Sequence, residues 1–136
     1  MPLPIENYAM IGDCHTAALV GCDGSIDWLC FPRFDSSACF AALLGGPEHG
    51  RWLLAPSAKI SRVQRQYRPG TLLLETEFYT EEGSIRVIDF MPLSDERWDI
   101  VRIVEGLSGR VAVRMELIVR FDGNTPDRRL SMDSIR

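Results

Sequence analysis

The sequence is poor in lysine and histidine. Lys59 is the single lysine among fifteen basic residues, and His15 and His49 are the only two histidines. A histidine without a geometric partner is weak evidence of acid–base chemistry, so we expect neither to be catalytic. The net charge of −4 does not suggest a nucleic-acid partner. These shortages disfavour a nucleic-acid partner and a histidine-based active site.

Long apolar runs are also missing. No stretch approaches the ~20 apolar residues that cross a bilayer, and the N-terminus lacks the basic and apolar regions of a secretory signal. We therefore expect no membrane partner and a cytoplasmic location. The four cysteines are spaced too widely for the close pairs of zinc sites, and we expect them reduced, with no metal and no cofactor. They are Cys14, Cys22, Cys30 and Cys39.

Familiar catalytic motifs are absent as well. The sequence has no Gly-Lys-Ser/Thr phosphate loop and no G-x-S-x-G elbow. Carboxylates crowd the N-terminal third, but no spacing selects the pair that glycoside hydrolysis requires. They are Asp13, Asp23, Asp27 and Asp35. We expect Asp27 to face solvent beside Trp28, and we expect this chain to contain no catalytic residue.

What the sequence does contain is an alternation of period two. In "RVAVRMELIVRFD" the positions from Val111 to Phe121 place apolar side chains on one face. Similar faces occur in "TLLLETEFYT" and "SIRVIDFMPL", where Asp89 lies either buried and hydrogen-bonded or at a strand end in solvent. Short Gly-containing connections favour antiparallel neighbours. The pattern predicts an all-β antiparallel sandwich of roughly eight to ten strands.

The first forty residues predict a hairpin followed by one short helix. Asp23-Gly24 suits a type I′ turn, because both residue types tolerate positive φ. After the third strand, "DSSACFAALLGG" has a helical signature: Asp35 or Ser36 would cap the start, and glycines would end it. The expected buried stripe of this helix is Phe40, Leu43 and Leu44.

Several separated motifs resemble one family. "YAMIGDCHTAALVGCDGSIDWLCFPRFDSSACFAALLG", "GRWLLAP", "YRPGTLLLETEF" and "VIDFMPL" occur in the order typical of the N-terminal region of bacterial glycoside hydrolase family 15 proteins, the glucoamylase and trehalase-like enzymes. The resemblance covers Ile5 to Asp122. It implies a supersandwich-like N-terminal β-domain before an α/α-toroidal catalytic domain. That domain would supply two glutamates as acid and base and cleave α-glucosidic bonds with inversion.

The resemblance divides the chain into two parts. Residues 1–122 would be the N-terminal β-sandwich domain, and 123–136, "GNTPDRRLSMDSIR", would be a polar tail that is truncated or disordered. The expected partners are the catalytic toroid and, through it, the α-glucoside substrate, while association of two copies stays open. We expect the chain alone to be inactive. The alternative is a free-standing carbohydrate-binding module with Trp98 as a stacking platform.

The segment "PRFDS" is the most specific candidate site. Pro32 ends the preceding strand because it cannot donate to a ladder, and Asp35 or Ser36 caps the expected helix. Arg33 and Phe34 then have no local role. We expect Arg33, Phe34 and Asp35 to lie at the domain junction or the rim of the active site, where a guanidinium and an aromatic ring suit a neighbouring surface. Alternatively, Phe34 folds into the core and Arg33 pairs on the surface.

Overall fold

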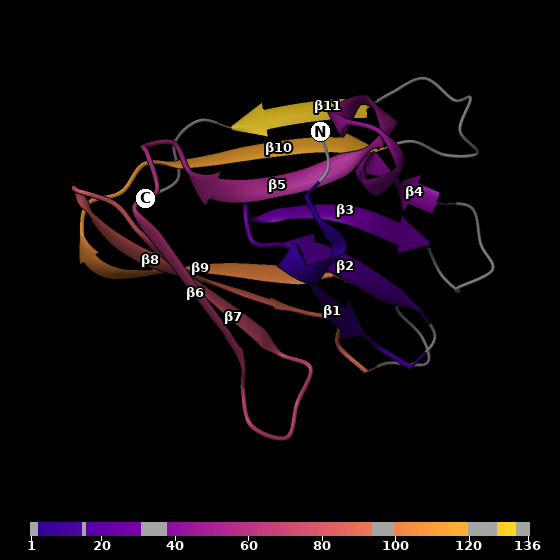
Figure 1. Cartoon of the computed structure of the whole chain (residues 1–136), viewed down its shortest axis with the longest axis horizontal. Helices are drawn as coiled ribbons and strands as arrows, with labels where there is room; N and C mark the ends of the chain where they lie inside the picture. The colour runs from indigo at the N-terminus through magenta and orange to yellow at the C-terminus, as the bar shows by residue number, and fades with distance from the viewer. Residues whose placement is uncertain (1–2, 15, 31–37, 94–99, 120–127, 133–136) are drawn as a thin grey trace.

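A computed structural model describes residues 3–14, 16–30, 38–93, 100–119 and 128–132. Within these ranges the regular structure consists of β-strands and three 3-10 turns, η1 (Ile5–Asn7), η2 (Ala42–Leu44) and η3 (Pro47–His49). The strands form two antiparallel sheets in a sandwich-like arrangement (Figure 1). The all-β class predicted from the alternation is confirmed. None of the described helical segments is long and apolar enough to cross a membrane.

The larger sheet has seven described strands in the order β1-β2-β3-β5-β10-β11, with β4 paired to β3. Each neighbouring pair is antiparallel. Consecutive β1, β2 and β3 form a meander, whereas β10 returns beside β5 from far along the chain. The strands are β1 (Tyr8–Gly12), β2 (Ala17–Gly21), β3 (Ser25–Cys30), β4 (Ala38–Phe40), β5 (Arg51–Pro56), β10 (Val113–Val119) and β11 (Arg128–Met132).

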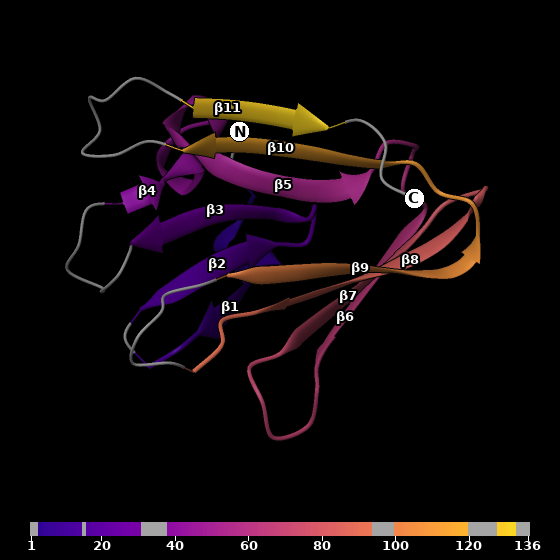
Figure 2. The ribbon, with the colours of Figure 1, turned by 180° about the vertical axis from the view of Figure 1, so that it is seen from behind.

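The smaller sheet is a four-stranded meander, β6-β7-β8-β9. Its strands are β6 (Arg62–Tyr67), β7 (Leu74–Tyr79), β8 (Gly83–Phe90) and β9 (Val101–Gly109). The loop between β6 and β7 projects beyond the rest of the molecule (Figures 1 and 2). The predicted face of Leu72, Leu74, Thr76 and Phe78 is confirmed for the last three, which are buried, but Leu72 lies before β7 and is 46% exposed.

The helix predicted over 35–46 is wrong for the part that the structure describes. Ala38–Phe40 form strand β4, and only the single 3-10 turn η2 follows. Phe40 is buried, but Leu44 is 72% exposed, so the expected apolar stripe does not form. The physical reason is pairing: Phe40 lies opposite Leu29 in the sheet, and such tertiary contacts override the weak helix preference of alanine.

The type I′ turn predicted at Asp23-Gly24 is also wrong. Of these two residues only Gly24 has positive φ, at 88°, and the amide of Gly24 donates to the Gly21 carbonyl over 3.0 Å. This is the three-residue connection in which a glycine in the left-handed region follows a turn. A Cβ on Gly24 would collide with the Leu54 carbonyl oxygen, so glycine is required for close approach as well as for φ.

Strand β10 is covered on both faces rather than one. Val113 is buried on the face predicted to be apolar, and Leu117 is partly buried against the same core. On the opposite face Glu116 and Ile118 are also buried, where β4 and η3 contact the strand. Strand β11 pairs with β10 from Met115 to Val119. Five residues of the segment expected as a tail thus form a strand, while the domain boundary at 122 stays a prediction.

A buried arginine joins the two sheets. Arg102 of β9 and Asp89 of β8 are 0% and 1% exposed, and Arg102 Nε donates to Asp89 Oδ1 over 2.7 Å. The other two guanidinium nitrogens reach the larger sheet, donating over 2.6 Å to the carbonyl oxygens of Trp52 and Gly24. The same guanidinium lies 5.3 Å from the centre of the Trp52 ring. Asp89 is therefore buried, as one of the two sequence interpretations held.

The edge strand β1 is closed by side chains from β6. The Tyr67 hydroxyl accepts from the Met10 amide over 3.0 Å and donates to the Met10 carbonyl over 2.8 Å. Arg65 donates to the carbonyl oxygens of Val20 and Asn7 over 2.9 and 2.7 Å. An open strand edge is a template for pairing with another chain. The Tyr67 contacts occupy backbone groups at that edge, and those of Arg65 tie the two sheets together a second time.

Replacing Arg102 with Leu should destabilise the fold strongly. The change leaves the Asp89 carboxylate buried without its cation, which typically costs about 3–5 kcal/mol of unfolding free energy. Chemical denaturation measures this loss. Arg62→Leu is the control: Arg62 also lies over an aromatic ring, 4.2 Å from the centre of Tyr79, but that exposed contact is worth about 0.5–1 kcal/mol. Equal losses in the two variants would contradict a central role for Arg102.

Candidate functional site

The residues predicted to form a domain-junction site lie outside the described part of the chain. Arg33, Phe34 and Asp35 fall in 31–37, and Trp98 falls in 94–99. The strands on either side of the first segment are placed: β3 ends at Cys30, which lies opposite Ala38 of β4. The segment therefore begins and ends at one end of the larger sheet. The roles assigned to these residues stay predictions.

The buried carboxylates of the described residues make structural contacts. Glu116 accepts two hydrogen bonds from Arg51, over 3.0 and 2.8 Å. Asp13 accepts the Thr16 amide over 2.9 Å in the β1–β2 turn. Glu75 accepts from Arg68 over 2.7 Å, and this hydrogen bond lowers the pKa of the Glu75 carboxyl. With Asp89 held by Arg102, each of these carboxylates is bound to another group of the fold.

Asp27 belongs to a buried polar cluster, and the expectation that it faces solvent is wrong. Its two oxygens accept from the Tyr8 hydroxyl and the Ser25 hydroxyl, each over 2.5 Å. Burial and the Asp27 charge raise the pKa of Tyr8 above its usual range. Burial also raises the pKa of Asp23, which accepts the Ser25 amide over 3.0 Å. The irregular pairing of β2 with β3 at Leu19 and Val20 breaks the simple alternation.

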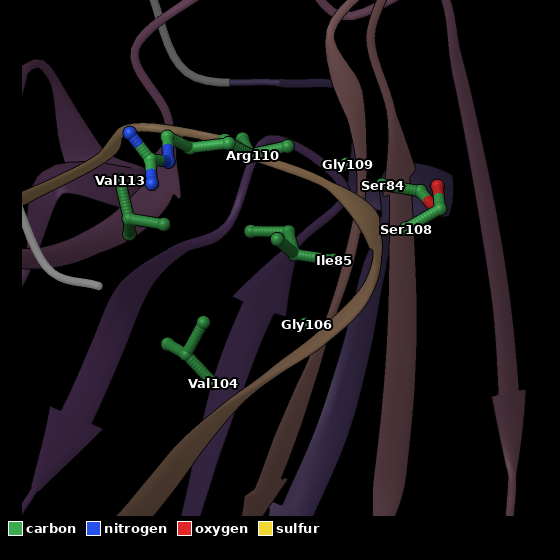
Figure 3. A pocket seen from close by; sticks show the side chains of 9 residues that line it. Ser84, Ile85, Val104, Gly106, Ser108, Gly109, Arg110 and Val113 are labelled. Atoms are coloured by element: carbon green, nitrogen blue, oxygen red, sulfur yellow. The ribbon is translucent and has the colours of Figure 1, made fainter.

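A small cavity of about 300 Å³ lies beside the irregular end of β8 and β9. Figure 3 shows Ile85 and Val104 pointing into it, with the Arg110 guanidinium at its rim. The two nearest hydroxyls, of Ser84 and Ser108, point away from it and are 2.7 Å apart. The two hydroxyls beside the cavity are thus hydrogen-bonded to each other and do not point into it.

A larger apolar groove of about 570 Å³ lies at the other end of the smaller sheet. We call it the end groove. Its walls come from the β1–β2 turn, the β6–β7 loop and the residues that follow β8. The lining residues that the structure describes carry no charge: they are Met10, Gly12, Cys14, Thr16, Ala17, Gly70, Thr71, Leu72, Leu73, Phe90, Met91, Pro92 and Leu93.

The described tryptophans are poor candidates for sugar stacking. Trp52 is partly buried, packs against an apolar core cluster and lies under the Arg102 guanidinium. Trp28 is half-buried in β3. Both positions are those of residues that pack within the fold. Within the described ranges, no three His, Cys, Asp or Glu side chains gather closely enough to hold a metal ion.

The sequence did not predict the end groove or the contacts that Arg102 makes with the larger sheet. The groove is built from three segments spread over eighty residues of the chain, so no local pattern contains it. One signal was present: Leu72 and Leu93 are apolar residues beside Gly70 and Pro92, in turn segments where polar side chains are usual. Both leucines belong to the alternating segments "TLLLETEFYT" and "SIRVIDFMPL", but the structure places them outside β7 and β8, where they line the groove.

Comparison with known proteins decides the family. A family model described as "Trehalase-like, N-terminal" matches residues 1–132. The chain belongs to this family. Its resemblance to the N-terminal region of trehalase-like enzymes is thereby confirmed. No solved structure matches the chain.

The similar curated proteins are all much longer than the matched region. A trehalase of Mycolicibacterium smegmatis is 34% identical over 88% of this chain, and a trehalase of Mycobacterium tuberculosis is 33% identical over 88%. In both cases the match covers only 20% of the relative. Trehalase 2 of Sulfolobus acidocaldarius is 40% identical over 65% of this chain and 15% of its own length. The chain therefore spans about a fifth of the relatives it matches.

The thiols should differ sharply in reactivity. Cys14, at the rim of the end groove, is exposed, whereas Cys39 is buried, and burial raises the pKa of Cys39 to about 11. Because the thiolate is the nucleophile, iodoacetamide at pH 8 should modify Cys14 first and Cys39 only after denaturation. Peptide mass spectrometry measures the order, with a urea-unfolded sample as the control. Equal rates at both sites in the folded chain would contradict this arrangement.

Proposed function

We propose that this chain is the non-catalytic N-terminal β-domain of a trehalose-hydrolysing enzyme of the glycoside hydrolase family 15 type. The observation that carries the proposal is the match of nearly the whole chain to a trehalase-like N-terminal family, together with relatives named trehalases. Because the match covers a fifth of those relatives, the chemistry is assigned to the remainder of such an enzyme.

A non-catalytic role accords with the carboxylates of the described residues. Inverting hydrolysis requires one carboxyl group to protonate the leaving oxygen and a second to activate a water molecule, about 6.5–9.5 Å away. Asp89 and Glu116 are instead bound to arginines, and Asp27 accepts two short hydroxyl hydrogen bonds. An acid needs a proton to give, and a base needs access to water. These buried groups, already engaged by the fold, suit neither role.

The mechanism proposed for the whole enzyme rests on the resemblance. Two glutamates of an α/α-toroidal domain would serve as acid and base, and the α-glucosidic bond would be cleaved with inversion. The β-domain would stabilise that domain and border its mouth. Its rigidity suits this task, because Arg102 and Arg65 fix the two sheets to each other at separate places.

Within this role, Arg33, Phe34 and Asp35 are proposed to lie at the junction with the catalytic domain. The described strands support the assignment in one respect. Cys30 of β3 and Ala38 of β4, which flank the segment, lie opposite each other, so the segment leaves and re-enters the same end of the larger sheet.

The isolated 136-residue chain should not hydrolyse trehalose, maltose or soluble starch. A longer protein that contains it, expressed from its complete reading frame, should hydrolyse trehalose. A glucose-release assay on both measures this, and Asp27→Asn in the isolated chain serves as a control for contaminating activity. Trehalose turnover by the purified chain that disappears in a carboxylate variant would contradict a non-catalytic role.

Exchanging Arg33 or Phe34 for Ala should separate interdomain contacts from folding. We expect the isolated chain to keep its unfolding free energy within about 0.5 kcal/mol, as is usual for surface changes. The longer enzyme should lose activity or thermal stability. Arg62→Ala, on the outside of the smaller sheet, is the control. If Phe34→Ala unfolds the isolated chain and Arg33→Ala leaves the enzyme's kinetics unchanged, the segment is structural only.

A further inference from the structure

Several large apolar side chains that line the end groove are exposed to solvent. Met10 is 47% exposed, Leu72 46% and Leu93 76%, and all three line the same groove. Single exposed apolar residues need no explanation, but several that line one hollow usually mark a surface meant to be covered. The groove continues inward to Met91, which is buried in an apolar core cluster. An occupant would therefore extend the core rather than lie on a polar rim.

Both sheets contribute to the groove. Gly12, Thr16 and Ala17 come from the β1–β2 turn of the larger sheet, whereas the β6–β7 loop and the end of β8 belong to the smaller one. The first two of these segments lie at the same end of the sandwich in Figures 1 and 2. Whatever fills the groove touches both layers at once, so its binding depends on the folded sandwich and not on one strand.

The lining selects the kind of occupant. None of the described lining residues is charged, and the polar side chains among them are Cys14, Thr16 and Thr71. A sugar or a phosphate needs several converging polar groups or a cation, which the described part of the lining does not offer. Apolar protein side chains need only a complementary hollow. The chemistry therefore favours a short, uncharged, apolar polypeptide segment over a carbohydrate or an anion.

We propose that the end groove is the docking seat for an apolar segment of the C-terminal remainder that the trehalase relatives carry beyond this domain. The inference rests on the proposed function. The family is described as N-terminal, and the match covers a fifth of each mycobacterial relative, so most of such an enzyme lies beyond this domain. A covalently attached segment also has a high effective concentration, which favours it over a second copy of the chain.

Cys14 gives a direct measure of whether the groove is covered. It lines the groove and is exposed, while Cys22 is half-buried and lies outside it. We expect iodoacetamide to modify Cys14 readily in the 136-residue chain and at least about tenfold more slowly in the protein encoded by the complete reading frame. Cys22 is the internal reference and should react alike in both. Peptide mass spectrometry quantifies each site.

Substitutions in the groove test whether it is the docking site. In the longer protein, Leu72→Asp and Leu93→Asp place a charge in the groove and should restore rapid modification of Cys14. Leu107→Asp is the matched control. Leu107 is also exposed, at 37%, but it lies near the C-terminal end of β9, away from the groove. This change should leave Cys14 protected. Thermal unfolding of each variant verifies that the sandwich remains folded.

The outcomes separate this inference from the proposed function. Trehalose hydrolysis by a longer protein whose Cys14 stays as reactive as in the 136-residue chain overturns the docking seat and leaves the function standing. Protection of Cys14 without hydrolysis contradicts the function alone. A reading frame that ends at Arg136 overturns the docking seat, because no C-terminal remainder would exist. Protection of Cys14 in the 136-residue chain also overturns it, since the chain's own residues or a second copy would then cover the groove.

Discussion

The arrangement of the two sheets depends on one buried cation. Arg102 binds Asp89 within the smaller sheet and two backbone carbonyls of the larger one. Asp89 lies on β8 between Val87 and Met91, which belong to two different apolar clusters. The ion pair thus divides the core. A buried guanidinium is costly unless its N–H groups meet acceptors. Since the acceptors of Arg102 lie on both sheets, they restrict the position of one sheet relative to the other.

The division of the core explains where the two hollows occur. One apolar cluster extends to the small cavity, through Ile85 and Val113. The other extends to the end groove through Met91. Apolar contacts alone would allow the sheets to slide, since they have no preferred direction. Fixed by Arg102 and by Arg65, the sandwich presents the end groove as a defined shape, which is what docking to a second domain requires.

The distribution of charge accords with a supporting role for this domain. Its buried carboxylates neutralise arginines or accept hydroxyl and amide hydrogen bonds, so they are committed to the fold. The described residues that line the end groove carry no charge. On the proposed function, a domain built in this way would present an apolar surface to a catalytic domain, on which the bond-breaking groups are expected.

The sequence alone determined the β class, because alternation of period two comes directly from the geometry of a strand. It also placed Leu74, Thr76 and Phe78 on one buried face, and its spaced motifs indicated the family. Tertiary structure decided the rest. Pairing with β3 turned the alanine-rich segment into β4, and an irregular register buried Asp27. Arg102 and the end groove combine residues far apart in the chain, so their contacts exist only once the sheets have packed.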